Sequence, residues 1–332
     1  MPQINFTQAK EFLEKISSED KVAIIHHNDT DGFASGILLY DWCKQKGTIP
    51  KTFTFVYKQW KEISLEEFDK ILIADVAPGG ILDLNLPLNK QILYTDHHPK
   101  KETIPEEIFA YQTAEEGYIP SSRTVGELTG LKPWLALSGT ISDAADLYSE
   151  NDEYLKKGLE KYNLSLEEFK KKIDHKITNF LCYFHKNPND AFEILKDINT
   201  IEEIEKIEKY SEPIENEIRE IIDNYESKRE NLNNATFYHF TTKYNVKKPV
   251  AAIISRNEPR TAFIFAIPKM ESDHQIELSA RNQSRKIDTS KLLEAGISGL
   301  ENAQTGGHFA AAGATIETKD LDKFKENIRR SR

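Results

Sequence analysis

The sequence predicts an α/β protein with a parallel sheet in its N-terminal part, a helical connecting segment and a smaller α/β domain near its C-terminal end. In the first part, apolar runs typical of buried strands alternate with stretches of helical periodicity, which is the pattern of parallel βαβ units. Strand-like runs are missing between residues 151 and 234, and they return after residue 234. We therefore expect three parts, residues 1–150, 151–234 and 235–332.

Composition places the chain among soluble globular proteins. Its 332 residues suffice for two domains of the usual ~100–200 residues. No apolar run approaches the roughly 18 residues of a membrane span, and the N-terminal residues lack the basic and apolar regions of a secretory signal. The two cysteines, Cys43 and Cys182, lie in helix-like patterns. They predict a reduced, cytoplasmic protein without a cysteine-based metal site.

Charge is distributed unevenly along the chain. The net charge of −10 argues against a general nucleic-acid coat protein. Residues 236–332, however, carry 16 Lys and Arg against 11 Asp and Glu, a net charge of +5, and the remainder carries −15. This asymmetry indicates either that the C-terminal part meets an anion or that it has a solvated basic face.

The N-terminal part is expected to hold four strands. Apolar residues on one face first predict a short amphipathic helix over residues 6–16. A loop is expected after the third strand, where a proline precedes two glycines at residues 78–80. The expected strands are 21–26, 52–56, 70–74 and 91–95, and the expected helices are 33–46, 122–129 and 133–147.

Isoleucines recur at spacings of three, four and seven across residues 201–222. The spacing predicts an amphipathic stripe, with a coiled-coil pair broken near Pro213 as one arrangement. The segment either connects the two domains or offers a surface for self-association or for a partner in replication or repair. In the C-terminal part the expected strands are 237–240, 250–254, 262–266 and 275–279, and the expected helices are 289–295 and 321–330.

Hard metal ligands follow several strands of the N-terminal part. Because the carboxyl ends of parallel strands meet at one edge of a sheet, these side chains can converge. Carboxylates with imidazoles suit Mn²⁺ or Mg²⁺, and a pair of ions ~3.5–4 Å apart can activate a water and clamp a phosphoryl group. The side chains are His27, Asp29 and Asp31 after the first strand, Asp75 after the third, Asp96, His97 and His98 after the fourth, and Asp143 at the end of a helix.

Five segments resemble the signature motifs of the DHH phosphoesterase superfamily and of its associated DHHA1 domain. The first four resemble the DHH motifs, and the fifth resembles the glycine-rich motif of DHHA1. The order of the motifs also agrees, and the compact length of the chain resembles that of short archaeal RecJ-like and Hef-associated nucleases. The segments are His27-Asn28-Asp29-Thr30-Asp31-Gly32, Asp75, Asp96-His97-His98, Gly139-Thr140-Ile141-Ser142-Asp143, and Thr305 to Gly313.

The resemblance implies two Mn²⁺ ions, or Mg²⁺ in their place, in a cleft between the DHH and DHHA1 domains. It implies that His98 contacts the scissile phosphate or assists the leaving group. Many RecJ-like nucleases have Asp where this sequence has His27, so the ligand role of His27 stays open. The implied ligands are Asp29 with His27 for one ion, Asp31, His97 and Asp143 for the other, and Asp75 as the bridge.

Five residues are candidates for binding the substrate. Gly306 and Gly307 allow the backbone to approach an anion, and His308 can donate to a phosphate oxygen; in isolation such a segment is equally a turn. Arg281 follows a strand and offers a planar fork suited to phosphate, or alternatively forms a surface salt bridge. Arg123 opens a helix whose N-terminus suits an anion, although capping by a neighbouring serine explains the same residues.

The leading hypothesis is a Mn²⁺-dependent phosphodiesterase that acts as an exonuclease on single-stranded DNA or RNA and releases nucleoside monophosphates. An alternative is a phosphodiesterase of short oligoribonucleotides, cyclic dinucleotides or phosphoadenosine phosphate. A non-catalytic replication or repair scaffold and an inorganic pyrophosphatase agree less well with the ligand set and the basic Arg281 segment. Polarity and the choice between DNA and RNA stay open, since Tyr111, Tyr118 and Trp134 are candidates either for base stacking or for the core.

Overall fold

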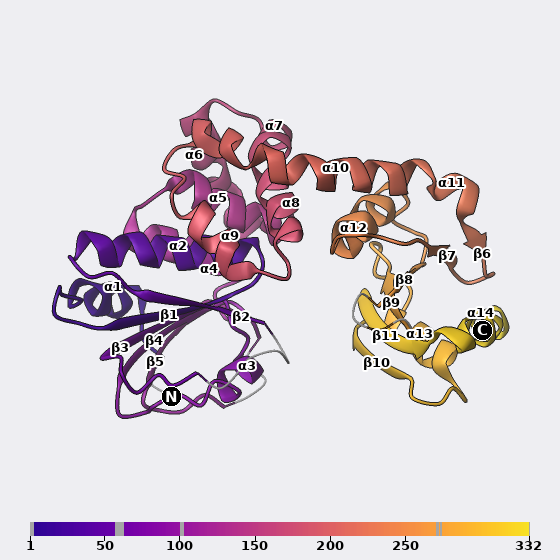
Figure 1. Ribbon diagram of the computed structural model, residues 1–332, viewed down its shortest axis with the longest axis horizontal. Helices are drawn as coiled ribbons and strands as arrows, with labels where there is room; N and C mark the ends of the chain where they lie inside the picture. The colour runs from indigo at the N-terminus through magenta and orange to yellow at the C-terminus, as the bar shows by residue number, and fades with distance from the viewer. Residues whose placement is uncertain (1–2, 57–62, 100–102, 270–271, 273, 332) are drawn as a thin grey trace. The chain divides into compact units, whose positions relative to one another are not determined.

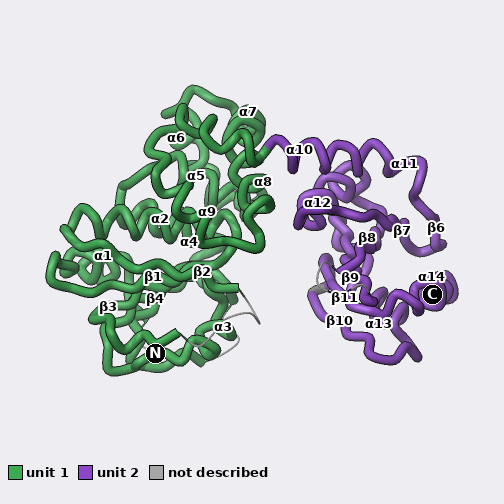
Figure 2. The backbone as a smooth tube through the Cα atoms, in the orientation of Figure 1, with its two compact units in different colours: residues 1–211 green, residues 212–332 purple. Residues whose placement is uncertain are grey.

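The computed structural model of the protein describes residues 3–56, 63–99, 103–269, 272 and 274–331 (Figure 1). The chain folds into two compact units, residues 1–211 and 212–332 (Figure 2). The first unit therefore contains most of the segment that the sequence separates as a helical connection. The expected boundaries near residues 150 and 234 and the expected cleft between domains stay predictions.

A five-stranded parallel sheet forms the centre of the first unit. Its order is β2-β1-β3-β4-β5, and every neighbouring pair is parallel. The four predicted strands are confirmed, whereas β5 is an additional edge strand that the sequence analysis did not identify. The strands are β1 (Val22–His27), β2 (Lys51–Phe55), β3 (Lys70–Ala74), β4 (Gln91–Asp96) and β5 (Ile108–Gln112).

Both faces of this sheet are buried. In β1, Val22 and Ile24 belong to one hydrophobic core, and Ala23 and Ile25 belong to the core on the opposite face. This burial explains why the strands are continuously apolar rather than alternating. The helices that share the first core are α1 (Phe6–Glu14), α2 (Thr30–Gln45), α4 (Ser121–Thr129) and α5 (Pro133–Ser142) (Figure 1).

The rest of the first unit is helical, as the sequence predicted. Phe169, Ile177, Phe180 and Phe192 of this region belong to the same core as the sheet, so the helices complete the first unit instead of standing apart from it. The elements are α6 (Asp152–Tyr162), α7 (Leu166–Phe169), a π-helical turn (Lys170–Asp174), α8 (His175–Tyr183), α9 (Pro188–Leu195) and a 3₁₀ helix (Ile201–Ile207).

The isoleucine stripe is largely covered within the chain. Ile204 and Ile207 lie in the core of the first unit, and Ile214 is fully buried on α10 (Glu208–Asp223). Pro213 lies inside α10 and does not separate two helices as expected. The buried isoleucines are not available to a partner, so a self-association surface would have to use other residues of this region.

The second unit contains a mixed six-stranded sheet with the order β10-β11-β9-β8-β7-β6. Only the pair of β7 and β8 is parallel. One face packs on α13 (Thr289–Ile297) and α14 (Leu321–Arg330), which contribute Leu293 and Phe324 to its core. The strands are β6 (Glu230–Asn231), β7 (Thr236–His239), β8 (Phe263–Pro268), β9 (Gln275–Arg281), β10 (Gln304–His308) and β11 (Ala311–Glu317).

One predicted strand is wrong. Residues 250–254 belong to α12 (Lys247–Asn257), where Val250, Ala251 and Ile254 form its buried face. The parallel pairing of β7 with β8 requires a crossover between them, and α12 provides it. A short apolar run has the same composition in a buried strand and in a helix, so periodicity alone cannot separate them.

Three further predictions differ from the structure in detail. The expected loop after β3 contains a short helix, α3 (Pro78–Leu82), and a proline at the first turn of a helix costs no hydrogen bond. Helix α2 begins at Thr30 instead of residue 33. Helix α5 ends at Ser142 and is followed by a separate 3₁₀ turn, Ala145–Leu147.

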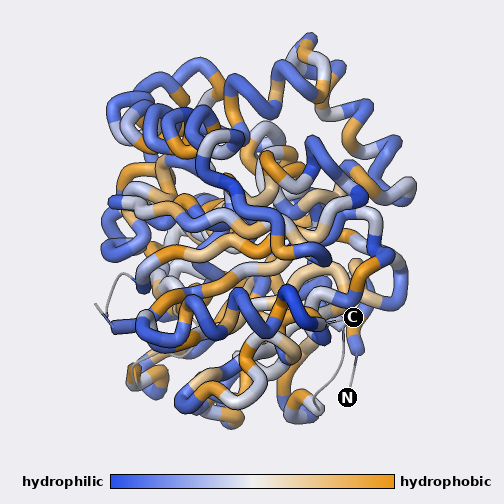
Figure 3. Tube along the Cα trace, turned by 90° about the vertical axis from the view of Figure 1, so that its right-hand side faces the viewer, coloured by the Kyte–Doolittle hydropathy of each residue, from blue (hydrophilic) through white to orange (hydrophobic). Residues whose placement is uncertain are grey.

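Apolar residues concentrate in the strands. In Figure 3, extended orange stretches lie in the middle of the view beside blue and pale ones, and the coiled segments around them alternate between orange and blue. Alternation of this kind is expected for helices with one solvated face. Among the described residues, no helix combines the length and the apolar character needed to cross a membrane.

Candidate metal centre

Three strand ends of the parallel sheet gather hard ligands at one edge. β1, β3 and β4 are neighbours in the sheet, and they end in or lead directly to His27, Asp75 and His97. Within each of three groups the ligand atoms lie no more than 4.8 Å apart. The groups are His27 with Asp29 and Asp75, Asp31 with His97 and Asp143, and Asp75 with His97 and His98.

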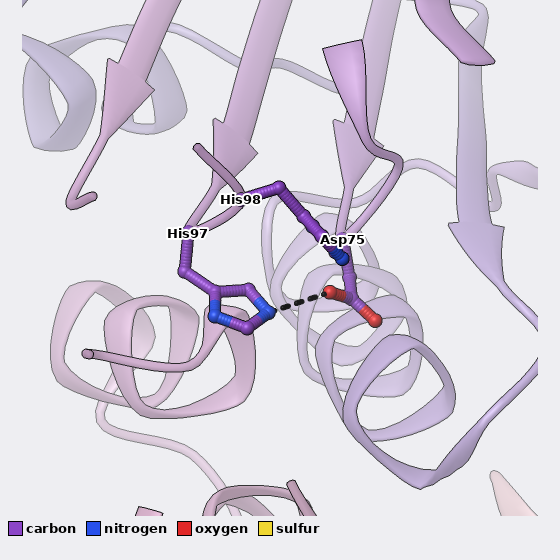
Figure 4. A group of neighbouring side chains, drawn as sticks. All are labelled: Asp75, His97 and His98. Carbon is purple, nitrogen blue, oxygen red and sulfur yellow. Dashed lines mark ion pairs between the residues drawn. The ribbon is translucent and has the colours of Figure 1, made fainter. Parts of the chain in front are cut away.

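Asp75 lies between the first two groups. Its Oδ2 is 3.6 Å from Nδ1 of His27, and its Oδ1 is 3.3 Å from Nε2 of His97. Figure 4 shows the His97 ring directed at this carboxylate from the end of the adjacent strand. Asp75 has a φ of 60°, a left-handed conformation that is uncommon for residues other than glycine and that is found at functional sites. The position and the backbone together indicate a carboxylate that can serve two ions.

The first ligand group is the more exposed one. Nδ1 of His27 lies 2.9 Å from Oδ2 of Asp29. Asp29 is the N-cap of α2, and its Oδ1 accepts a hydrogen bond of 3.1 Å from the backbone N–H of Gly32. A Cβ atom on Gly32 would lie 2.5 Å from the carbonyl oxygen of His27. Glycine at this position therefore allows α2 to begin directly behind the ligand strand.

The second ligand group is the more buried one, because Asp31 and His97 are buried and Asp143 is 25% exposed. Asp31 lies in the first turn of α2, because this helix begins before residue 33, where the sequence analysis expected it to begin. Its carboxylate accepts hydrogen bonds from the backbone N–H groups of Ser121, at 3.0 Å, and Ser122, at 2.8 Å. Its Oδ2 lies 3.9 Å from Nε2 of His97, which is 3.5 Å from Oδ2 of Asp143. Asp29 and Asp31 therefore belong to different ligand groups, as expected.

Burial and mutual repulsion raise the pKa values of two carboxylates in the second group. Burial, together with the charges of Asp75 and Asp143, raises the pKa of Asp31 well above its usual value. Burial also raises the pKa of Asp143 to about 6, against the opposing effect of the neighbouring His97. Crowded carboxylates of this kind favour any cation that can neutralise them.

The pKa values of the imidazoles are raised, whereas burial alone would lower them. Burial lowers the pKa of His27, but the negative charges of Asp29 and Asp75 outweigh it and raise the pKa to about 10. The carboxylates around His97 likewise outweigh its burial and raise its pKa to about 9. Protons on these rings and metal ions in the site are alternative ways to balance the same negative charge.

The donor set fits divalent ions. Nδ1 of His27, Oδ1 of Asp75 and Oδ2 of Asp143 are buried and have no hydrogen-bond partner within the described part of the chain, although they lie within ion-pair distance of other ligands. Unpartnered buried polar atoms are costly, and an ion would bind them. Oxygen and imidazole donors without sulfur favour Mn²⁺ or Mg²⁺ over a structural zinc ion.

His98 is oriented by Asp96. Its Nδ1 lies 2.8 Å from Oδ1 of Asp96, and its backbone N–H donates to Oδ2 of the same carboxylate at 3.0 Å. The Asp96 side chain is fully buried, whereas that of His98 is 37% exposed. Nδ1 is therefore bound to the carboxylate, and Nε2 remains for a substrate. The aspartate of this motif thus positions the histidine.

Tyr118 is a site residue whose contacts the sequence did not reveal. Its phenol lies next to the carboxylate of Asp143, and burial together with that negative charge raises its pKa above the usual value. Its ring meets the His97 ring at 5.2 Å between centroids and 85° between planes. The contact joins a loop to a helix end, and nothing in the local sequence indicates such a meeting.

Arg123 occupies a structural position. The N-terminus of α4, expected to bind an anion, is capped by the carboxylate of Asp31 instead, and the N-cap residue is Pro120 and not a serine. The guanidinium donates through Nη1 to the Glu150 carbonyl and to Oδ1 of Asn151, both at 2.8 Å. Substrate binding by Arg123 stays a prediction, and these contacts favour a supporting role.

The remaining substrate candidates lie in the second unit. Gly306 and Gly307 belong to β10, which pairs with β11, so they form part of a hairpin and not a free loop. A Cβ atom on Gly307 would lie 2.5 Å from Cα of Ala312, so the hairpin itself requires that glycine. In the sheet, Ala311 pairs with His308 on one side and with Arg281 on the other. The two candidates therefore lie at the same end of the sheet.

Comparison with known families identifies both units. Residues 21–129 match the model of the DHH family N-terminal domain, and residues 234–331 match the DHHA1 domain. The two matches together cover more than half of the chain and include most of the candidate ligands. Among curated proteins, a sequence search finds no match.

Solved structures agree with this fold at low sequence identity. An exonuclease RecJ bound to manganese is 16% identical, with a TM-score of 0.70, over 99% of this chain and 94% of that one. RecJ from Thermus thermophilus in complex with Mn²⁺ is 17% identical, with a TM-score of 0.72, and this chain covers 55% of its length. CDC45 from Entamoeba histolytica is 13% identical, with a TM-score of 0.59, over 98% and 99% of the two chains. The chain belongs to the DHH superfamily, with a DHH domain followed by a DHHA1 domain.

Proposed function

We propose that the protein is a phosphodiesterase that uses two Mn²⁺ ions, with Mg²⁺ as a substitute, and that it degrades single-stranded nucleic acid from an end, releasing nucleoside monophosphates. The observation that carries the proposal is the pair of ligand groups joined by Asp75, which contacts His27 through one oxygen and His97 through the other. The RecJ structures with the same fold contain Mn²⁺ or Mg²⁺, which supports the choice of ions.

The ligands divide between the two ions as the geometry groups them. His27 and Asp29 would hold one ion, Asp31, His97 and Asp143 would hold the other, and Asp75 would bind both. When bound, two ions supply a nucleophile at neutral pH and neutralise charge on the phosphoryl oxygens during displacement. The protein contributes the fixed spacing of the donors, which the sheet edge and the first turn of α2 determine.

His98 acts on the substrate side of this centre. Asp96 fixes its ring through Nδ1, so Nε2 can donate a hydrogen bond to the phosphate or to the oxygen of the leaving group. Burial lowers the pKa of His98, but Asp96 and the nearby carboxylates outweigh it and raise the pKa to about 9. The pairing with Asp96 favours the protonated ring, which is the form that a general acid requires.

In the second unit, Arg281 and His308 would contact the phosphate backbone of the bound strand. Burial lowers the pKa of Arg281 from its very high usual value, and a guanidinium remains charged in proteins, so it can pair with phosphate. The net positive charge of residues 236–332 supports the same assignment. These residues would hold the chain of nucleotides while the metal centre cleaves.

A non-catalytic role is the second candidate, because CDC45 shares the fold. It predicts a protein that binds partners or nucleic acid without hydrolysis. The complete set of converging ligands favours the enzyme, since a scaffold has no need for crowded, unpartnered carboxylates.

Hydrolysis of defined substrates tests the proposal. The purified protein with Mn²⁺ would be incubated with a single-stranded 20-mer labelled at either end, a linear dinucleotide and a cyclic dinucleotide, with Asp75→Asn as the control. We expect stepwise shortening of the 20-mer, absent in the control, and the labelled end that disappears first gives the polarity.

Cleavage of the dinucleotides alone would replace the exonuclease with turnover of short or cyclic nucleotides. No cleavage of any substrate, with Mn²⁺ bound, would favour the scaffold.

A further inference from the structure

Tyr118 contacts only one half of the metal centre in the contacts that the structure defines. Its ring lies against the ring of His97, with 5.2 Å between centroids and 85° between planes, and its phenol lies next to the carboxylate of Asp143. Asp143 and His97 belong to the group completed by Asp31, whereas His27 and Asp29 form the other group. A residue that touches two ligands of one ion is placed to influence that ion selectively.

The position of Tyr118 is fixed by its surroundings. Its ring stacks on Tyr148, with 4.4 Å between centroids and 17° between planes. The fully buried Asn151 donates through Nδ2 to the Tyr118 carbonyl at 2.9 Å and to the Ala145 carbonyl at 3.1 Å. The backbone N–H of Tyr118 donates to Oε1 of Glu150 at 2.5 Å. Stacking therefore fixes one face of the Tyr118 ring, and hydrogen bonds fix the backbone N–H and carbonyl of the same residue.

Arg123 binds the two residues that hold the Tyr118 backbone. Its Nη1 binds the Glu150 carbonyl and Oδ1 of Asn151, each at 2.8 Å, and its guanidinium lies 5.0 Å from the Tyr154 ring. Glu150 and Asn151 end the second of two short 3₁₀ turns after Asp143, which spans Ser149–Asn151. The same network thus ties the segment behind the ligand Asp143 to the loop that carries Tyr118.

A polar group held next to a ligating carboxylate restricts how that carboxylate can turn. Asp143 is the C-cap residue of α5 and its side chain is 25% exposed, so the helix alone does not fix its oxygens. Partners of this kind around metal ligands typically change metal affinity about 10- to 100-fold when they are removed.

We propose that Tyr118 is a positioning residue that orients Asp143 and His97 and thereby sets the affinity of the ion held by Asp31, His97 and Asp143, with little effect on the other ion. The inference rests on the proposed two-ion centre. It assigns Arg123 and Asn151 to the support of Tyr118 instead of to the substrate.

Calorimetric titration of the full chain with Mn²⁺ tests this role, because it measures the two sites without any turnover. Tyr118→Phe removes only the phenol oxygen and keeps the ring stack. We expect two ions to bind the wild-type protein, and one of the two dissociation constants to rise about 10- to 100-fold in Tyr118→Phe. The other constant should stay unchanged. Tyr148→Phe, which removes the hydroxyl of the stacked partner, should leave both constants unchanged.

Asp143→Asn identifies the affected site. The ion that binds more weakly in Asp143→Asn should be the same ion that binds more weakly in Tyr118→Phe. The double variant should lose less affinity than the sum of the two single losses, because both substitutions act on one ligand. Equal constants in wild type and Tyr118→Phe would overturn the inference and leave the two-ion centre intact. Equal weakening of both ions in Tyr118→Phe would also overturn it. A wild-type protein that binds no Mn²⁺ would refute the proposed function itself.

Discussion

The two halves of the candidate metal centre offer similar ligands in different surroundings. In the half formed by His27 and Asp29, the side chains are 27% and 43% exposed. In the other half, those of Asp31 and His97 are 2% and 4% exposed, and that of Asp143 is 25% exposed. A solvated carboxylate keeps its charge at little cost, whereas a buried one needs an opposite charge or several donors. We therefore expect the more buried half to depend on an ion more strongly than the exposed half does.

Local structure supports the same contrast. Asp29 accepts one hydrogen bond as the N-cap of its own helix. Asp31 accepts two from the first residues of α4, so its charge faces the positive end of another helix. Even so, its pKa remains well above the usual value because of burial and the neighbouring carboxylates. The donors orient Asp31 but do not neutralise the group, which leaves that task to a cation.

Asp75→Asn should have the largest effect, because Asp75 reaches both halves through its two carboxylate oxygens. Asparagine tolerates the left-handed backbone at this position, so folding is preserved. We expect loss of high-affinity Mn²⁺ binding at both sites and a fall in kcat/KM of about 10³-fold or more, about 4 kcal/mol of transition-state stabilisation. Calorimetry and nuclease assays measure the two effects. Retention of one normal Mn²⁺ site would contradict the bridging role.

Asp143→Asn and Asp29→Asn should separate the halves. We expect Asp143→Asn to weaken one ion about 100-fold, about 2.7 kcal/mol. Asp29→Asn should weaken the other ion only about tenfold, because charges in solvent interact through a higher effective dielectric constant. Titration with Mn²⁺ measures both affinities. Equal losses in the two variants would show that exposure does not determine how strongly each ligand matters.

The sequence was sufficient to predict which candidate ligands the structure brings together, because parallel strands bring their carboxyl ends to one edge whatever the details of packing. His27, Asp75 and His97 follow from that rule alone. The contact of Tyr118 with Asp143 could not be predicted in this way, since it depends on the path of a loop across the end of a helix. Contacts between segments distant in the sequence leave no local pattern.

The fold shows the same division. The strands of the first unit are long apolar runs and were predicted, except for β5. The hairpin of β10 and β11 was missed because it is rich in glycine and alanine, which have weak strand preference; pairing with β9 determines its conformation instead. Helix α12 was mistaken for a strand because its buried residues form a short apolar run.

The pH dependence of the metal-free protein offers a third test of the contrast. A group whose pKa is higher in the folded than in the unfolded state stabilises the fold below its unfolded pKa, and this stabilisation is lost as pH rises through the folded pKa. Burial raises the pKa of Asp143 from 3.8 to about 6, and the surrounding carboxylates raise the pKa of His97 from 6.5 to about 9. The free energy of unfolding without metal should therefore decrease as pH rises from about 4 to about 9.

Urea unfolding in the presence of a chelator measures this dependence. With saturating Mn²⁺ the trend should weaken or reverse, because the ion requires deprotonated ligands and binds more tightly as pH rises. Asp143→Asn should remove the part of the slope between about pH 4 and about pH 6. A metal-free protein that becomes more stable over this whole range would contradict the crowded, buried half of the site.

Substitutions at Asp29 should have the smallest effect. Comparing two of them separates the role of Asp29 as a metal ligand from its role as the N-cap of α2. Both Asp29→Asn and Asp29→Ala remove the negative charge next to His27, but asparagine retains an oxygen that can accept from the N–H of Gly32. Alanine at an N-cap costs about 1 kcal/mol, which lowers the melting temperature of a unit of this size by roughly 2–4 °C. Asp29→Ala should therefore melt below Asp29→Asn without metal, while both variants lose comparable Mn²⁺ affinity. Equal melting temperatures would mean that the exposed half contributes a ligand but no structural support to α2, and would remove the cap from the account of how Asp29 is held in place.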